Sequence, residues 1–229
     1  MTWPERRHTV SAFDEEIARL CAQLEAMGER AAGAVDRSLQ AVAAGDLWLA
    51  RRVVAEDDLL DQAQIAVEKL VVTMMALRSP MADDLRLLVA ALRIAAVLER
   101  VGDYAKNVAR RAESVAGAGH QAALPAIAAM GQDAAAMVRM AVAAFLERDV
   151  DAARAVVARD DQVDEAWRRL RRDLGQGTSG ADGAGIALDL LLVGQHLERI
   201  GDHATNIAEA VYLMVTGERM GPAELEAAA

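Results

Sequence analysis

Two segments decide the fold of this chain: LERVGD at residues 98–103 and LERIGD at residues 197–202. The match continues through the following turns, so that eight of the 13 residues from Leu98 to Arg110 recur 99 positions later. Chance repetition of a helical composition would give scattered alanine matches, whereas glycine, aspartate and asparagine recur here in register. The chain therefore contains an internal duplication.

The duplication extends back towards the N-terminus, where the offset between the copies is 103 residues. Met27-Gly28 recurs as Met130-Gly131, and the aspartates at 57, 58 and 61 recur at 160, 161 and 164. Helix-favouring residues are abundant, while Phe, Trp and Tyr together make up only 3% of the 229 residues. We therefore predict an all-α protein.

Turn-forming residues divide each copy into three helices. Gly45-Asp46 ends one helix and offers Asp46 as the N-cap of the next, and Asp149 holds the equivalent place in the second copy. Ser79-Pro80 separates the second and third helices, with Pro80 expected at the first helical position. The predicted helices span residues 9–44, 46–78, 80–116, 124–147, 149–174 and 184–216.

Short connections make neighbouring helices antiparallel. The predicted fold is two tandem antiparallel three-helix bundles related by internal duplication, with a glycine-rich loop at 175–185 in the second. The predicted domain organisation is an N-terminal tail at 1–8, a first repeat at 9–116, a linker at 117–123, a second repeat at 124–216 and a C-terminal tail at 217–229.

Charge and composition exclude several classes of function. A formal net charge of -10 would repel nucleic-acid phosphates, so no nucleic-acid partner is expected. The single cysteine, Cys21, allows neither a disulfide framework nor a cysteine zinc site. The N-terminus lacks a signal-peptide core, and charges interrupt the apolar stretches well short of the roughly 20 residues that span a bilayer. We expect a cytoplasmic protein that meets membranes only through partners.

Acidic residues form i,i+4 pairs at equivalent positions of the two copies. Asp57 with Asp61, and Glu99 with Asp103, each share a helix face about 6 Å apart. The first pair lies about 20 residues before the Ser79-Pro80 turn and the second about 21 after it, so both stand roughly 30 Å from the turn. The same level match holds for the pairs of the second copy: Asp160 with Asp164, and Glu198 with Asp202.

Four carboxylates at one level repel one another unless a cation or shared protons relieve them. Oxygen-rich sites suit hard cations such as Mg²⁺, Mn²⁺, Ca²⁺ and ferric iron, so we predict two metal sites. A solvated acidic face is the alternative for any single pair. Gly102 and Gly201, in the middle of helices, indicate either close helix approach or backbone access, because glycine there costs about 1 kcal/mol relative to alanine.

The two copies differ in their candidate additional ligands. Asn107 and Asn206 lie one turn beyond the aspartates and could either complete coordination or bond a neighbouring helix. Glu209 lies near the face of Glu198, and Arg110 holds the equivalent place in the first copy. The second cluster therefore has the richer ligand set, and Arg110 is expected to weaken the first.

An enzyme is disfavoured. No nucleophile–base constellation, phosphate-binding loop or dinucleotide motif is present. A carboxylate-bridged di-iron-like oxidase or hydrolase is the alternative function. Its usual Glu-x-x-His pattern occurs here only from Glu5 to His8, outside the core helices.

The duplicated signature resembles the PhoU family. The resemblance rests on ERIGDHATNIAE at 198–209, its twin at 99–110, PMADDLR at 80–86, and the segments at 8–16 and 27–28. It covers residues 8 to about 216. The sequence departs from the family pattern at Val97, His196 and Arg110, where acidic residues are frequent.

The resemblance implies a cytoplasmic adaptor, often homodimeric, between the ATPase subunit of the phosphate-specific ABC transporter and the phosphate-sensing histidine kinase. Such an adaptor represses the phosphate-starvation response when phosphate is plentiful. The resemblance also implies multinuclear iron clusters, with zinc, manganese, magnesium and calcium as alternatives. The family's Glu/Asp-x-x-x-Asp ligand motifs match Asp57 and Asp61, Glu99 and Asp103, Asp160 and Asp164, and Glu198 and Asp202.

Overall fold

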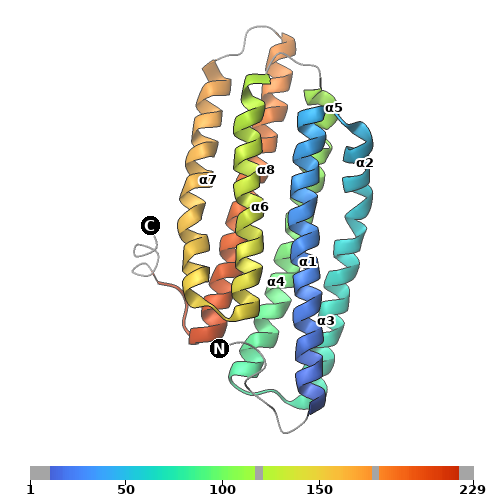
Figure 1. Cartoon of the computed structure of the whole chain (residues 1–229), viewed down its shortest axis with the longest axis vertical. Coiled ribbons are helices and arrows are strands. Elements are labelled where there is room, and N and C mark those ends of the chain that lie inside the picture. Colours follow the sequence, from blue (N-terminus) through green and yellow to red (C-terminus); the bar gives the residue numbers. More distant parts are fainter. Residues whose placement is uncertain (1–10, 117–120, 177–180, 222–229) are drawn as a thin grey trace.

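A computed structural model describes residues 11–116, 121–176 and 181–221, and within these ranges all regular structure is helical. The first copy forms α1 (Ser11–Ala44), α2 (Leu47–Glu56), α3 (Asp58–Arg78), α4 (Asp83–Ala109) and the short α5 (Ala112–Val115). A 3₁₀ turn, η1 (Gln121–Ala123), precedes α6 (Leu124–Glu147), α7 (Val150–Gln176) and α8 (Ala181–Thr216) of the second copy. The long helices run side by side along one axis (Figure 1), which confirms the predicted all-α fold of two tandem bundles.

The predicted caps are confirmed at both equivalent positions. The Asp46 carboxylate accepts a hydrogen bond from the Leu49 N–H at 2.9 Å. The Asp149 carboxylate likewise accepts from the Ala152 N–H at 2.9 Å. Each aspartate satisfies a backbone donor that has no partner within its helix, which fixes where α2 and α7 begin.

Two predicted helices have different boundaries. The helix expected at 46–78 divides at Asp57, where the Leu60 N–H bonds the Asp57 carbonyl at 2.8 Å and tightens the turn. The helix expected at 80–116 begins three residues later than predicted, because Ser79 and Ala82 take positive φ angles of 46° and 47°. Pro80 is therefore not its first residue. It also ends earlier than predicted, at Ala109, and a separate short helix, α5, follows it.

Parts of the predicted organisation fall outside the described residues: the tail at 1–8, most of the linker at 117–123 and the last eight residues of the tail at 217–229. The predicted glycine-rich loop is shorter than expected. Residues 175 and 176 still belong to α7, and α8 already begins at Ala181.

The two copies pack against each other through equivalent helices, α1 against α6 and α4 against α8. At the α1–α6 contact the Val142 side chain packs against Gly28, and its Cγ2 lies 2.8 Å from the position that a Cβ would take on residue 28. The Leu39 side chain packs against Gly131 in the same way. Because both the glycines and their partners are 103 residues apart, the contact is reciprocal. The glycines therefore let two duplicated helices approach closely.

Equivalent residues also meet each other between the copies. Asp36 on α1 pairs with Arg139 on α6, its counterpart in the duplication, at 2.6 Å. Between α4 and α8, the ring centroids of Tyr104 and its counterpart His203 lie 5.3 Å apart. A contact between equivalent positions requires an approximate twofold axis between them. The duplicated halves are therefore arranged as a pseudo-dimer within one chain.

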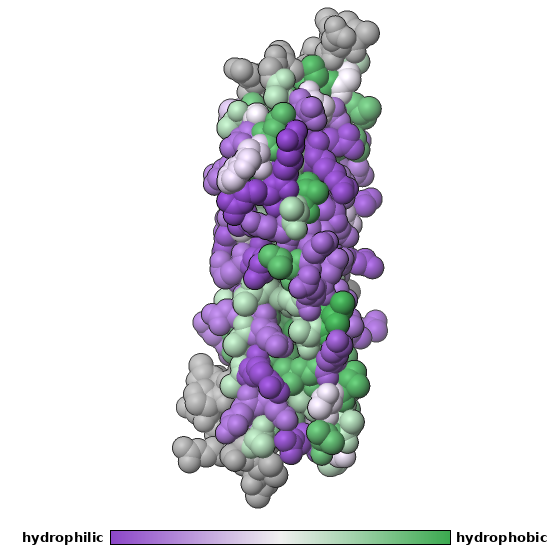
Figure 2. Space-filling view, turned by 90° about the vertical axis from the view of Figure 1, so that its right-hand side faces the viewer, coloured by the Kyte–Doolittle hydropathy of each residue, from purple (hydrophilic) through white to green (hydrophobic). Residues whose placement is uncertain are grey.

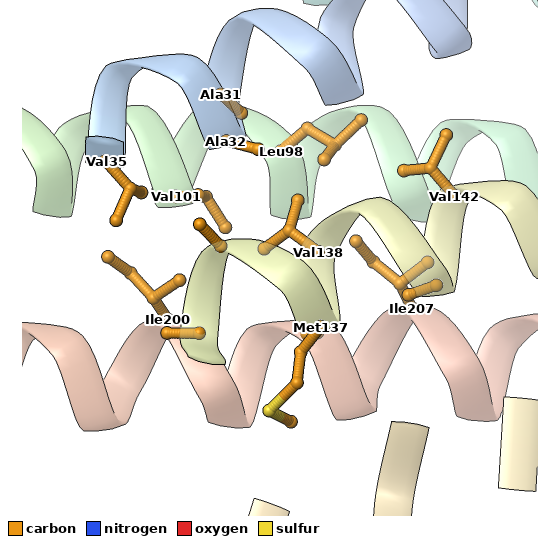
Figure 3. Packing of buried hydrophobic residues seen from close by; sticks show 14 of the residues in the cluster. Ala31, Ala32, Val35, Leu98, Val101, Met137, Val138, Val142, Ile200 and Ile207 are labelled. Carbon is orange, nitrogen blue, oxygen red and sulfur yellow. The ribbon is translucent and has the colours of Figure 1, made fainter. Parts of the chain in front are cut away.

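The core is continuous across both copies. Figure 3 shows side chains from α1, α4, α6 and α8 converging between the helices. The labelled members are Ala31, Ala32, Val35, Leu98, Val101, Met137, Val138, Val142, Ile200 and Ile207. Burying a side chain of the size of leucine or isoleucine stabilises a fold by about 1.5–3 kcal/mol. The shared core therefore holds the two bundles in one arrangement.

Apolar side chains are concentrated on part of one face of the molecule (Figure 2). Figure 2 shows hydrophobic residues gathered on the lower half of the face formed by α3 and its neighbours, with a mostly hydrophilic upper half. Exposed side chains where α3 ends and α4 begins are Val72, Leu77, Met81, Leu85 and Val89. Gathered apolar side chains are typical of surfaces that contact other proteins. No helix among the described residues is long and apolar enough to cross a bilayer.

Candidate metal centres

The first acidic cluster lies between α4 and the junction of α2 and α3. Asp57 sits at that junction and is only 7% exposed. Glu99 and Asp103 face it from α4, and the pKa of Glu99 is raised by burial and then by the negative charges of Asp103, Asp61 and Asp57. The structure therefore brings together the two pairs that the sequence places on separate helices.

Lys106 also belongs to this cluster, and it was not predicted from the sequence as a site residue. Its ammonium group contacts carboxylate oxygens of both Asp57 and Asp103, the latter at 2.5 Å. Burial alone would lower the pKa of Lys106, but the two carboxylates outweigh burial and raise it. The i,i+3 spacing from Asp103 to Lys106 was the available signal. The cation of the first cluster is therefore Lys106, whereas Arg110 is hydrogen-bonded to Asn107 at 3.2 Å.

The second cluster lies between α7 and α8, and among the described residues no lysine or arginine bridges its carboxylates from one helix to the other. Burial, followed by Asp202, Asp164, Asp161 and Glu198, raises the pKa of Asp160 to about 7. Burial and the neighbouring carboxylates also raise the pKa values of Glu198 and Asp202. Among the described residues, the ion pair made by this cluster is Arg168 to Asp164 at 2.8 Å, within α7 itself. Its carboxylates therefore repel one another across the helix pair.

The glycines of the signature let the two helices of each cluster approach closely. A Cβ on Gly201 would stand 2.8 Å from Oδ1 of Asp160, inside van der Waals contact. A Cβ on Gly102 would stand 3.3 Å from Oδ1 of Asp57 and would collide with Leu60. Leu60 and Val163, the latter near Gly201, are again equivalent positions. Of the two interpretations of these glycines, the structure supports close helix approach.

The candidate additional ligands lie outside the two sets of coupled carboxylates. Asn107 accepts the bond from Arg110 on the surface of α4. Asn206 and Glu209 line a groove of about 700 Å³ between α4 and α8, which Arg93 and Arg100 also line. The sequence could not distinguish this face from the neighbouring one, because α8 contacts α4 and α7 on adjacent sides.

The donor chemistry of the second cluster fits a hard cation, since a cation would offset both the burial and the mutual repulsion that raise the pKa values of its carboxyl groups. The first cluster fits less well, because the Lys106 ammonium already contacts two of its carboxylates and offsets one of their negative charges. In the arrangement of the described residues, no three His, Cys, Asp or Glu side chains converge as ligands of one ion. Coordination by either cluster would need side chains to rotate towards one another.

Fold and site together define an internally duplicated, all-α bundle protein with acidic clusters at equivalent positions. Comparison with known proteins gives the family. The model of the PhoU domain matches residues 24–112 and 127–211, so the chain belongs to the PhoU family.

Similar proteins are described as accessory proteins of the phosphate-specific transport system. A phosphate-specific transport system accessory protein PhoU homolog from Caulobacter vibrioides is 40% identical over 215 residues, covering 93% of this chain and 94% of its own. The homolog from Zymomonas mobilis is 37% identical, covering 93% of this chain and 90% of its own. The crystal structure of PhoU from Pseudomonas aeruginosa superimposes with a TM-score of 0.83 at 32% identity, over 90% of this chain and 100% of that chain.

Proposed function

We propose that this protein is a cytoplasmic regulator of phosphate uptake that acts as an adaptor. Its two partners are the ATPase subunit of the phosphate-specific ABC transporter and the phosphate-sensing histidine kinase. When phosphate is plentiful, the adaptor represses the phosphate-starvation response. It acts as a homodimer and performs no catalysis of its own.

The observation that carries this proposal is the match, over most of the chain, to accessory proteins of the phosphate-specific transport system. The matches cover at least 90% of both chains for the two relatives named above. A match of that extent includes both bundles and both clusters, so it is not limited to one shared structural unit. The exposed apolar residues at the end of α3 and the start of α4 offer a surface for protein contacts.

The proposal includes metal binding by Asp160, Asp164, Glu198 and Asp202. Support comes from their mutual repulsion and from the all-oxygen donor set, which suits iron, manganese, magnesium or calcium better than thiol-seeking metals. A bound metal would supply positive charge between α7 and α8 and so hold the two helices together. Elemental analysis of protein purified without chelators, wild type against Glu198→Gln/Asp202→Asn, tests this part.

Gene deletion tests the regulatory role. Removing the gene should raise expression of phosphate-starvation genes in phosphate-rich medium, and a chromosomal copy of the wild type should restore repression. Unchanged expression after deletion, in a strain with no second family member, would overturn the proposal. A pull-down against the transporter ATPase and the kinase tests the two contacts, and light scattering gives the oligomeric state.

The alternative function is a carboxylate-bridged metalloenzyme. An iron oxidation assay distinguishes this enzyme from a non-catalytic adaptor. Iron(II) and dioxygen are supplied to the wild type and to Glu198→Gln/Asp202→Asn. Equal rates of iron oxidation support the non-catalytic role. Turnover that the double substitution abolishes would favour the enzyme.

A further inference from the structure

We propose that Lys106 is the resident cation of the first acidic cluster, so that the first repeat does not take up a metal ion and the two repeats have different roles. The inference concerns this chain's departure from the symmetry of its own duplication. It rests on the proposed function only in taking the second cluster as the metal site.

The contacts of Lys106 span the two helical segments that form the first cluster. Its ammonium group bonds Asp103 on its own helix, α4, and Asp57 at the junction of α2 and α3. The Asp57 side chain is 7% exposed and that of Lys106 is 20% exposed. A cation that bridges two helices and neutralises an almost fully buried carboxylate occupies the place that a metal ion would have to take.

The choice of lysine is itself informative, since the chain has 25 basic residues and only Lys69 and Lys106 are lysines. A lysine ammonium is a compact point charge on a flexible stem, and it fits between two converging carboxylates. The planar guanidinium of arginine is wider and favours side-by-side pairing with one carboxylate. One of the two lysines therefore stands where a metal-sized cation is needed.

The second repeat has Thr205 at the equivalent position, 99 residues later. The Thr205 hydroxyl donates to the Asp202 carbonyl at 2.7 Å, within α8, and makes no bridge to α7. No positive charge spans the second pair of helices among the described residues. After the duplication, the first cluster therefore contains its own ammonium group, that of Lys106. The second cluster has none at the equivalent position and can accept an external cation.

A metal ion that enters the first cluster must displace the Lys106 ammonium group from the carboxylates of Asp57 and Asp103. Mn²⁺ is a suitable probe, because it takes the oxygen ligands that both clusters offer. Four proteins are stripped with chelator and dialysed against Mn²⁺, and bound manganese per chain is measured by elemental analysis. They are the wild type, Lys106→Thr, Lys106→Thr/Asp103→Asn, and Lys69→Thr as the control for loss of a surface lysine.

Lys106→Thr should bind at least one more Mn²⁺ per chain than the wild type, and the gain should disappear when Asp103→Asn is added. Lys69→Thr should match the wild type. In chelator, Lys106→Thr should melt roughly 5 °C lower than the wild type, and Mn²⁺ should restore the loss. A folded Lys106→Thr that binds no additional Mn²⁺, or a gain that survives Asp103→Asn, overturns the inference.

A measurement on the wild type covers the case in which Lys106→Thr does not fold. Because the chain has two lysines, acetylation followed by mass spectrometry reports on each separately. Lys106 should react more slowly than Lys69, and saturating Mn²⁺ should leave its rate unchanged. A rise to the rate of Lys69 would show displacement by metal and overturn the inference. If the wild type binds no Mn²⁺ but Lys106→Thr does, the second cluster is not a metal site. That result overturns the metal binding proposed for the second cluster and still supports the inference about Lys106.

Discussion

The close approach of α4 to α3 gives a sharp prediction for Gly102→Ala. The added methyl would collide with Leu60, and Leu60 cannot swing into solvent because it is 2% exposed. Alanine is a better helix former than glycine by about 1 kcal/mol, but overpacking a filled core costs about 1–3 kcal/mol. The net effect on the free energy of unfolding is a loss of about 1 kcal/mol.

Gly185→Ala is the matched control, because Gly185 lies in α8 with no atom within 4 Å of the added methyl. It should gain up to about 1 kcal/mol from helix propensity alone. The two variants should therefore differ by about 2 kcal/mol. In a chain of this size, that difference separates the apparent Tm values by about 4–8 °C.

Thermal melting followed by circular dichroism, in chelator so that metal makes no contribution, measures this difference. The order expected is Gly185→Ala highest, wild type next and Gly102→Ala lowest. If Gly102→Ala melts as high as Gly185→Ala, α3 and α4 do not approach as closely as described, and the account of the signature glycine is wrong.

The remaining predictions concern the second cluster and the core. The pKa of Asp160 is about 7 in the folded chain against an ordinary 3.8, so between these values the folded state binds more protons than the unfolded state. Stability in chelator should therefore fall as pH rises through this window. The Tm advantage of Asp160→Asn over wild type should grow from pH 4 towards a plateau above pH 7, and a pH-independent difference would contradict the assignment. Leu98→Ala, in the fully buried core shared by both copies, should destabilise by about 2–5 kcal/mol. The same change at Leu77, which is 68% exposed, should stay within about 0.5 kcal/mol; similar losses in denaturant titrations of the two variants would contradict the single continuous core.

The sequence determined the fold because the signals for it are local or repeated. The caps at Asp46 and Asp149 depend on a side chain and backbone donors two or three residues away, so both were predicted correctly. Turn-forming residues marked three helical segments in each copy, and the short connections between the segments made neighbours antiparallel. The errors in the helices of the first copy lie at Ser79 and Ala82, whose positive φ angles are not favoured by their residue types, and at Asp57, where a helix with good propensity divides. The end of α4 at Ala109 was also placed too late.

The sequence also determined that Asp57 and Glu99 would meet, because helix rise is constant and levels along a hairpin can be counted from the turn. Only the tertiary structure decided what neutralises them. The contact of Lys106 with Asp103 follows from i,i+3 spacing, but its contact with Asp57 depends on the angle and distance between α4 and the α2–α3 junction. From the sequence, Arg110 was expected to make the first acidic cluster differ from the second. In the structure, the basic residue that contacts the first cluster is Lys106. Periodicity fixes the face on which a side chain lies, whereas packing between helices fixes which charge it meets.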